Sequence, residues 1–154
     1  MYKKISMLLL AVFTAATAHP VMAQNDDRGP AAARLVVENY YKAIDTADYR
    51  AAYRLWGEGG GGGGSASGKT FAVFRHGFAS TTRSRVVTGA PTNGDAGAGS
   101  IYIDVPVEVF ATLKDGRKQH FRGKYTLRRV NDVDGATQEQ LDWHIASATL
   151  RLGR

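Results

Sequence analysis

Hydrophobic positions in the first part of the chain recur at helical spacing. From Val36 to Ile44 they return every three or four residues, which predicts an amphipathic helix with Pro30 in its first turn. The polar segment Asp45–Asp48 interrupts this pattern and provides a cap for a second helix over Tyr49–Trp56. Apolar residues three and four apart then predict a third, short helix containing Phe71, Phe74 and Phe78.

After Thr82 the period changes to two, which indicates strands. Ala90–Gly99 is expected to be a turn-rich loop, and the Asp-Gly pair at 115–116 is typical of a tight hairpin. Pro106 has no N–H to donate, so a bulge or a sheet edge is expected there. The order predicts an α+β fold with N-terminal helices packed on a curved four-stranded antiparallel sheet. Its strands are predicted near Thr82–Thr88, Ser100–Leu113, Lys118–Val130 and Gln140–Leu152.

The N-terminus has the order of a secretory signal peptide. Two lysines precede a short apolar run, and small residues then end in Val21-Met22-Ala23. Cleavage after Ala23 is predicted for residues 1–23, because the apolar run is shorter than the ~20 residues that cross a bilayer. Residues 24–29 are polar and expected to be disordered, and residues 30–154 form the predicted single domain. The predicted location is therefore the periplasm or the exterior, with no membrane span after cleavage.

A glycine-rich segment at 57–68 is expected to be a flexible loop within this domain. Its end matches the phosphate-binding pattern G-x-x-x-x-G-K-[ST] through Gly63, Gly68, Lys69 and Thr70. A working loop of this kind follows a buried strand, whereas a helix is predicted here. We therefore interpret the match as accidental and predict no nucleotide site.

Charge and composition narrow the classes of partner. The chain has 20 Lys and Arg against 14 Asp and Glu, a mild excess for a nucleic-acid-binding protein, so no nucleic-acid partner is expected. It has no cysteine, which excludes disulfide and thiol chemistry. No histidine pair has the spacing of a helical metal site, so neither a metal nor a cofactor is predicted.

Two stretches resemble the NTF2-like superfamily, which includes ketosteroid isomerase-like and SnoaL-like domains. The helical start Val36–Trp56 is similar to that of small exported members, and Trp143-His144-Ile145 is similar to a common closing strand. The resemblance implies a cystatin-like cone with a pocket between helices and concave sheet, and often a homodimer through the sheet. It implies no particular activity, because this fold hosts enzymes, binders and interaction modules.

Aromatic side chains are the candidate lining of such a pocket. Tyrosine and tryptophan combine an apolar ring with a polar group, which suits a ligand site, although the same spacing also suits ordinary core packing. The candidate pocket residues are Tyr40, Tyr53, Trp56, Phe74, Tyr125 and Trp143.

An acid–base site is the alternative, with Asp104 as base, Tyr53 as donor and His76 as a second titrating group. The strand phase turns Asp104 away from Ile103, which favours an exposed pair with Arg122 or Arg128 instead. The leading hypothesis is therefore an exported, non-catalytic binding or accessory protein of the cell envelope, with a small apolar ligand or an envelope protein as partner. The alternative is a small isomerase- or dehydratase-type enzyme that transfers a proton inside the cone.

Overall fold

The computed structural model of the protein describes residues 28–57, 69–97 and 99–153. The predicted signal peptide, most of the segment 24–29 and most of the glycine-rich loop 57–68 lie outside the described residues, so these assignments stay predictions. Within the described ranges, no helix has the length and apolar character needed to cross a membrane.

The three predicted helices are confirmed. α1 spans Pro30–Asp45, α2 spans Tyr49–Arg54 and α3 spans Phe71–His76. The Asp48 carboxylate caps α2 by accepting a backbone hydrogen bond at 3.0 Å, as the sequence predicts. The buried face of α1 carries the residues at helical spacing, namely Ala33, Val37, Tyr40, Tyr41 and Ile44.

The sheet is antiparallel throughout, with the order β1-β3-β4-β5, and β2 pairs with β3 as well. A fourth, short helix, α4 (Gln138–Leu141), precedes the last strand. The predicted hairpin turn between β3 and β4 is confirmed, with Gly116 at φ 85°. The strands are β1 Thr81–Thr88, β2 Thr92–Gly97, β3 Ser100–Leu113, β4 Lys118–Val130 and β5 His144–Leu152.

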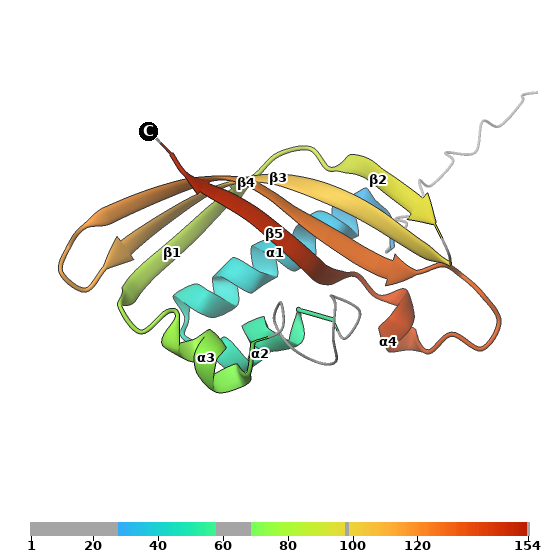
Figure 1. Cartoon of the computed structure of the whole chain (residues 1–154), viewed down its shortest axis with the longest axis horizontal. Helices are drawn as coiled ribbons and strands as arrows, with labels where there is room; N and C mark the ends of the chain where they lie inside the picture. Colours follow the sequence, from blue (N-terminus) through green and yellow to red (C-terminus); the bar gives the residue numbers. More distant parts are fainter. Residues whose placement is uncertain (1–27, 58–68, 98, 154) are drawn as a thin grey trace, which may run out of the picture.

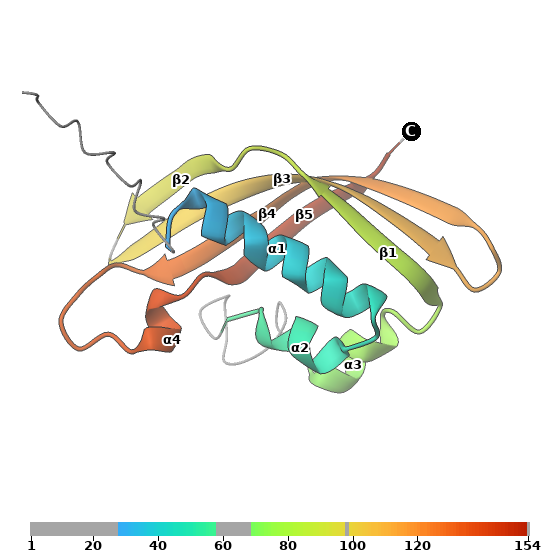
Figure 2. The same ribbon diagram turned by 180° about the vertical axis from the view of Figure 1, so that it is seen from behind.

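The helices lie on one side of the curved sheet (Figures 1 and 2). Two polar contacts fix α1 against β1: the Thr88 hydroxyl donates to Glu38 at 2.7 Å, and the Ser84 N–H donates to the Asp45 carboxylate at 2.7 Å. The core fills the space between α1 and the sheet. Its strand residues alternate as predicted and are Ile103, Val105, Val107, Val109, Tyr125, Leu127 and Ile145.

Two predictions about the sheet are wrong, and a third holds on one side of a strand. Residues 92–97, expected to be loop, form β2 along the same edge of β3 as β1. The expected irregularity at Pro106 is found on one side of β3 only: the pairing with β4 is continuous, but between β1 and β2 three residues, 89–91, lie opposite residues 105–106. The Pro106 carbonyl accepts from the Gly89 N–H at 2.8 Å. The proline nitrogen, which has no hydrogen to donate, therefore lies on the side of β3 where the pairing is interrupted between β1 and β2.

The second wrong prediction concerns the last strand, expected from Gln140. The chain forms α4 first, and β5 begins only at His144. Thr137 and Gln140 form a capping box, in which each side chain accepts a hydrogen bond from the other residue's backbone N–H. This Thr-x-x-Gln pattern is a sequence signal that identifies the start of α4.

Candidate ligand-binding site

Trp56 is placed by a short pairing between the end of the helical segment and β5. The Ile145 N–H donates to the Leu55 carbonyl at 2.8 Å, and Trp56 and Ile145 form an isolated parallel bridge. The indole is thereby held against Tyr40, with ring centroids 6.1 Å apart at 76°. It also meets Tyr125 edge to face at 6.3 Å.

A cavity of about 420 Å³ opens between α1, α3 and β5. This cavity, called the cone cavity below, is largely aromatic, which suits a small apolar ligand. Of the predicted pocket residues it contains Tyr40, Trp56 and Phe74. Lys69 and Ser147 add polar groups that the sequence reasoning missed. The remaining lining residues are Val73, Gly77, Phe78 and Ala148.

Three buried tyrosines stand beside the cone cavity. The Tyr41 and Tyr125 hydroxyls share a hydrogen bond of 2.7 Å. Burial raises the pKa of Tyr40, and the nearby Tyr125 adds to that rise. Burial likewise raises the pKa values of Tyr41 and Tyr125 well above the ordinary range. All three phenols therefore stay protonated near neutral pH, so they serve as hydrogen-bond donors and not as bases.

The Tyr41–Tyr125 hydrogen bond gives a testable coupling. Tyr125→Phe is expected to lower the free energy of unfolding by about 1–3 kcal/mol, because the Tyr41 hydroxyl then stays buried without its partner. The double variant with Tyr41→Phe is expected to lose less than the two single losses combined. Urea unfolding measures all three, with Tyr102→Phe on the outer sheet face as the control. Strictly additive losses would contradict the coupling.

The Trp56 indole N–H is buried and makes no hydrogen bond of ordinary distance and angle among the described residues, although it lies near enough to the Tyr40 hydroxyl to oppose the rise in that phenol's pKa. A buried donor without a partner costs about 1–3 kcal/mol. A ligand oxygen in the cone cavity would recover that cost only after the side chains that cover the N–H move aside, because the Nε1 atom is fully buried. The cavity therefore offers an aromatic wall close to an unsatisfied donor.

The other three predicted pocket residues do not line the cone cavity. The Tyr53 hydroxyl donates to the Lys69 carbonyl at 2.8 Å, which ties α2 to the start of α3. Tyr125 lies in the core behind Tyr41. The Trp143 indole N–H donates to the Arg28 carbonyl at 2.7 Å, next to the beginning of α1.

The structure does not bring the candidate acid–base residues together. Asp104 alternates with the buried Ile103, so it lies on the sheet face away from the helices. The expected pair with Arg122 or Arg128 is wrong: Lys124 contacts the Asp104 carboxylate at 2.6 Å, and Thr126 donates to it at 2.6 Å. Burial tends to raise the pKa of Asp104, but these two hydrogen bonds prevail and hold it below the ordinary value.

The remaining sequence candidates have ordinary surroundings where they are described. His76 is exposed on α3. Gly63 and Gly68 of the phosphate-loop match lie outside the described residues, whereas Thr70 caps α3 through its hydroxyl at 3.4 Å. In the described ranges, no group of three or more His, Asp or Glu side chains is placed to hold a metal ion.

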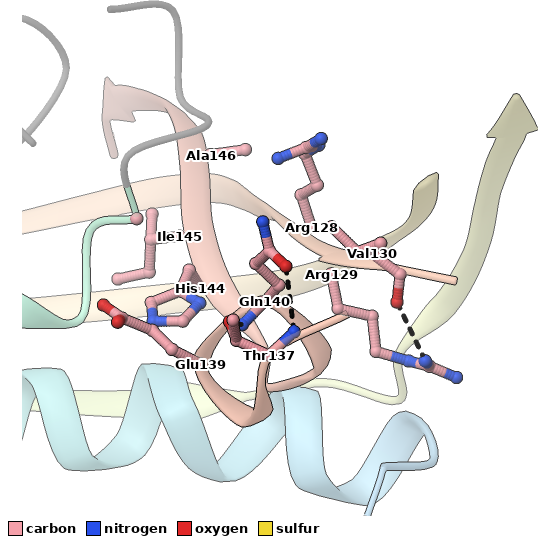
Figure 3. A pocket seen from close by; sticks show the side chains of 10 residues that line it. Arg128, Arg129, Val130, Thr137, Glu139, Gln140, His144, Ile145 and Ala146 are labelled. Carbon is pink, nitrogen blue, oxygen red and sulfur yellow. Dashed lines mark hydrogen bonds between the residues drawn. The ribbon is translucent and has the colours of Figure 1, made fainter. Parts of the chain in front are cut away.

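A second cavity of about 390 Å³ lies where β4 extends beyond β5 (Figure 3). This cavity, called the niche below, has both polar and apolar lining. Its lining residues are Gly57, Arg128, Arg129, Val130, Thr137, Glu139, Gln140, His144, Ile145 and Ala146. The sequence reasoning did not anticipate it, because α4 forms one of its walls.

Three solved structures share the arrangement of helices and sheet. A protein of Novosphingobium aromaticivorans, provisionally named an aromatic ring hydroxylase, aligns at a TM-score of 0.56 and 18% identity over 80% of this chain and 91% of its own. A second protein of that organism, provisionally named a scytalone dehydratase, aligns at 0.54 and 12% identity over 78% and 80%.

The third structure is an NTF2-like superfamily protein of Salmonella enterica serovar Typhimurium. It aligns at a TM-score of 0.51 and 12% identity over 82% of this chain and 94% of its own. No protein-family model matches the chain, and no curated protein sequence does. The likeness is one of fold, and it agrees with the order of helices and curved antiparallel sheet described above. The chain has the NTF2-like α+β cone fold.

Proposed function

We propose that the protein binds a small, largely aromatic molecule with one acceptor oxygen in the cone cavity. The observation that carries this proposal is the buried Trp56 N–H, without a hydrogen bond of ordinary geometry among the described residues, beside Tyr40 and Phe74 at a cavity of about 420 Å³. A ligand ring would pack against the aromatic walls, and its oxygen would accept from Trp56.

The chemistry of the lining supports binding over proton transfer. General acid–base catalysis needs a base within hydrogen-bond reach of the substrate. Among the described residues that line the cone cavity there is no carboxylate and no histidine, and the phenol of Tyr40 is held protonated. Lys69 is the one cationic residue among the described residues that line this cavity.

An isomerase- or dehydratase-type enzyme is the second candidate. The neutral Tyr40 phenol favours it, because a protonated phenol can donate to a developing oxyanion. The provisional names of two proteins of similar fold include a hydroxylase and a dehydratase, at identities that indicate shared fold alone. Turnover lost in Tyr40→Phe with unchanged stability would favour this candidate.

The proposal includes two further predictions, that the protein is exported and that it forms a homodimer. The predicted signal peptide places the binding domain in the periplasm or outside the cell, as an accessory protein of the envelope. The predicted homodimer would pair the outer sheet faces. On that face Arg122 pairs with Glu108 and Lys124 pairs with Asp104, so two copies would meet through side chains of both charges.

The test compares two probes that differ in one oxygen. 1-Indanone carries a carbonyl acceptor on a bicyclic aromatic frame, and indane has the frame alone. The protein is expected to bind indanone more tightly, and Trp56→Phe is expected to weaken indanone binding roughly tenfold while leaving indane binding nearly unchanged. Chemical-shift titration by NMR measures both affinities.

The matched control removes an aromatic polar group outside the cone cavity. Tyr102→Phe alters β3 on the outer face and is expected to leave both affinities unchanged. Equal affinity for the two probes, or no loss of indanone binding in Trp56→Phe, would contradict the proposed role of the indole N–H.

A further inference from the structure

The niche lies where β4 continues past the beginning of β5. His144, the first residue of β5, pairs with Arg128, so Arg129 and Val130 of β4 extend beyond the last pair. α4 and Thr137 lie beside this end of β4, which has no partner on the β5 side, and leave a cavity of about 390 Å³ (Figure 3). It shares no lining residue with the cone cavity.

Hydrogen-bond donors converge on the niche from two elements. Arg128 on β4 donates through Nε to the Ser100 hydroxyl at 3.1 Å, and its terminal nitrogens have no partner in the described part of the chain. Gln140 on α4 accepts from the Thr137 N–H through Oε1 at 2.9 Å. This bond orients the Gln140 amide, so its Nε2 donors stay available.

Arg129 contributes a buried positive charge, and its guanidinium group lies over the Trp143 ring, 5.4 Å from the ring centroid. Its side chain is 10% exposed, and its Nε is buried without a partner among the described residues. Its Nη1 donates to the Val130 carbonyl at 3.2 Å, but the Asp132 carboxylate lies 3.6 Å away, beyond hydrogen-bond distance. Asp132 is exposed and also contacts Arg28, so one carboxylate serves two guanidinium groups.

The third wall of the niche adds a histidine. His144 Nδ1 lies 3.1 Å from the Asp142 carbonyl, which places the proton on Nδ1. Glu139 is the opposing group, an exposed carboxylate on α4. Among the described lining residues, the guanidinium groups of Arg128 and Arg129 outnumber the one carboxylate, although these two consecutive strand residues point to opposite faces of the sheet (Figure 3). Of the two, Arg128 has no carboxylate partner among the described residues, and a guanidinium group in that position is stabilised by an added anion.

We propose that the niche binds an oxyanion, a carboxylate or phosphate group, independently of the cone cavity. The terminal nitrogens of Arg128 and the Gln140 amide donate to its oxygens, and the positive charge of Arg128 sets the preference for an anion. No sequence motif indicates this site, because α4 brings Gln140 next to β4 only in the folded chain.

Inorganic phosphate and acetate are the two probes, titrated separately at constant ionic strength against chloride. Backbone amide signals of Arg128, Gln140 and His144 are expected to shift saturably with at least one probe, and the stronger probe identifies the anion class. Arg128→Gln is expected to weaken that binding roughly tenfold, since a hydrogen bond to a charged group is lost. Arg122→Gln, on the outer face and 61% exposed there, is the matched control and is expected to change nothing.

Gln140→Glu separates binding from folding. Glutamate at this position keeps the capping box of α4 but replaces two donors by a negative charge. Binding is expected to fall more than tenfold while far-ultraviolet circular dichroism and the thermal midpoint stay unchanged. Linear, non-saturating shifts with both probes, or equal losses in Arg128→Gln and Arg122→Gln, would overturn the proposal.

Discussion

Gly123→Ala is expected to lower the free energy of unfolding by roughly 3 kcal/mol, because β4 and β5 approach too closely at Gly123 for a side chain. A methyl group added there would overlap the Thr149 carbonyl oxygen and lie 3.0 Å from the Leu150 Cα. These are backbone atoms, so relief requires the two strands to separate. β5 also contributes Ser147 to the lining of the cone cavity, so a separation of the two strands changes the cavity as well. Chemical denaturation measures the loss.

Gly97→Ala is the matched control for this prediction. Gly97 also lies in a strand, β2, but an added methyl group would have no atom within 4 Å. Its effect is expected to stay within about 0.5 kcal/mol, the range of ordinary surface substitutions. A Gly123→Ala protein as stable as Gly97→Ala would show that the strands are further apart than described.

Leu127→Ala is expected to cost about 3–4 kcal/mol of unfolding free energy, within the usual range for a fully buried leucine. Leu127 has no exposed surface and is among the largest fully buried side chains. It sits in the centre of the sheet between Ile103 and Ile145, its partners on the neighbouring strands. Deleting its methyl groups leaves a void that the rigid strands on both sides close only in part.

Leu152→Ala makes the same deletion on an exposed site of the sheet. Leu152 is 69% exposed at the end of β5, so its loss removes little buried surface. An effect below about 1 kcal/mol is expected in the same denaturation assay. Similar losses in the two variants would mean that Leu127 is not part of a close-packed core.

The sequence was sufficient for the helices and for the two long central strands. In α1 and in β3 the period of the apolar residues matches the period of the element, and packing reinforces that local preference. The predicted α+β class is therefore confirmed. The Asp48 cap and the turn at Gly116 follow from single-residue chemistry and are also confirmed.

The edges of the sheet could not be predicted in the same way. β2 has the sequence Thr-Asn-Gly-Asp-Ala-Gly, which is poor in strand-forming residues, and it forms because β3 offers it a free edge. Pro106 is tolerated inside the sheet because its missing donor faces the break between β1 and β2. Both outcomes depend on contacts between segments and not on local composition.

The candidate site was predictable in kind but not residue by residue. Helical spacing identifies Tyr40, Trp56 and Phe74 as buried aromatics, and all three line the cone cavity. The same pattern cannot distinguish a ring that faces a cavity from one packed in the core, as Tyr125 is. The register between β4 and β5 also shifts between Thr126 and Leu127, so simple alternation does not predict that Ser147 and Ala148 line the cavity.

The most direct test of ligand binding in the cone cavity is to locate a bound probe in the protein. Intermolecular nuclear Overhauser effects between 1-indanone and the isotope-labelled protein report this at the level of single side chains. Contacts from the indanone ring to Phe74 and to the Trp56 indole N–H are the predicted result. Contacts confined to outer-face residues such as Val87, or none at saturating probe, would contradict the proposed binding function.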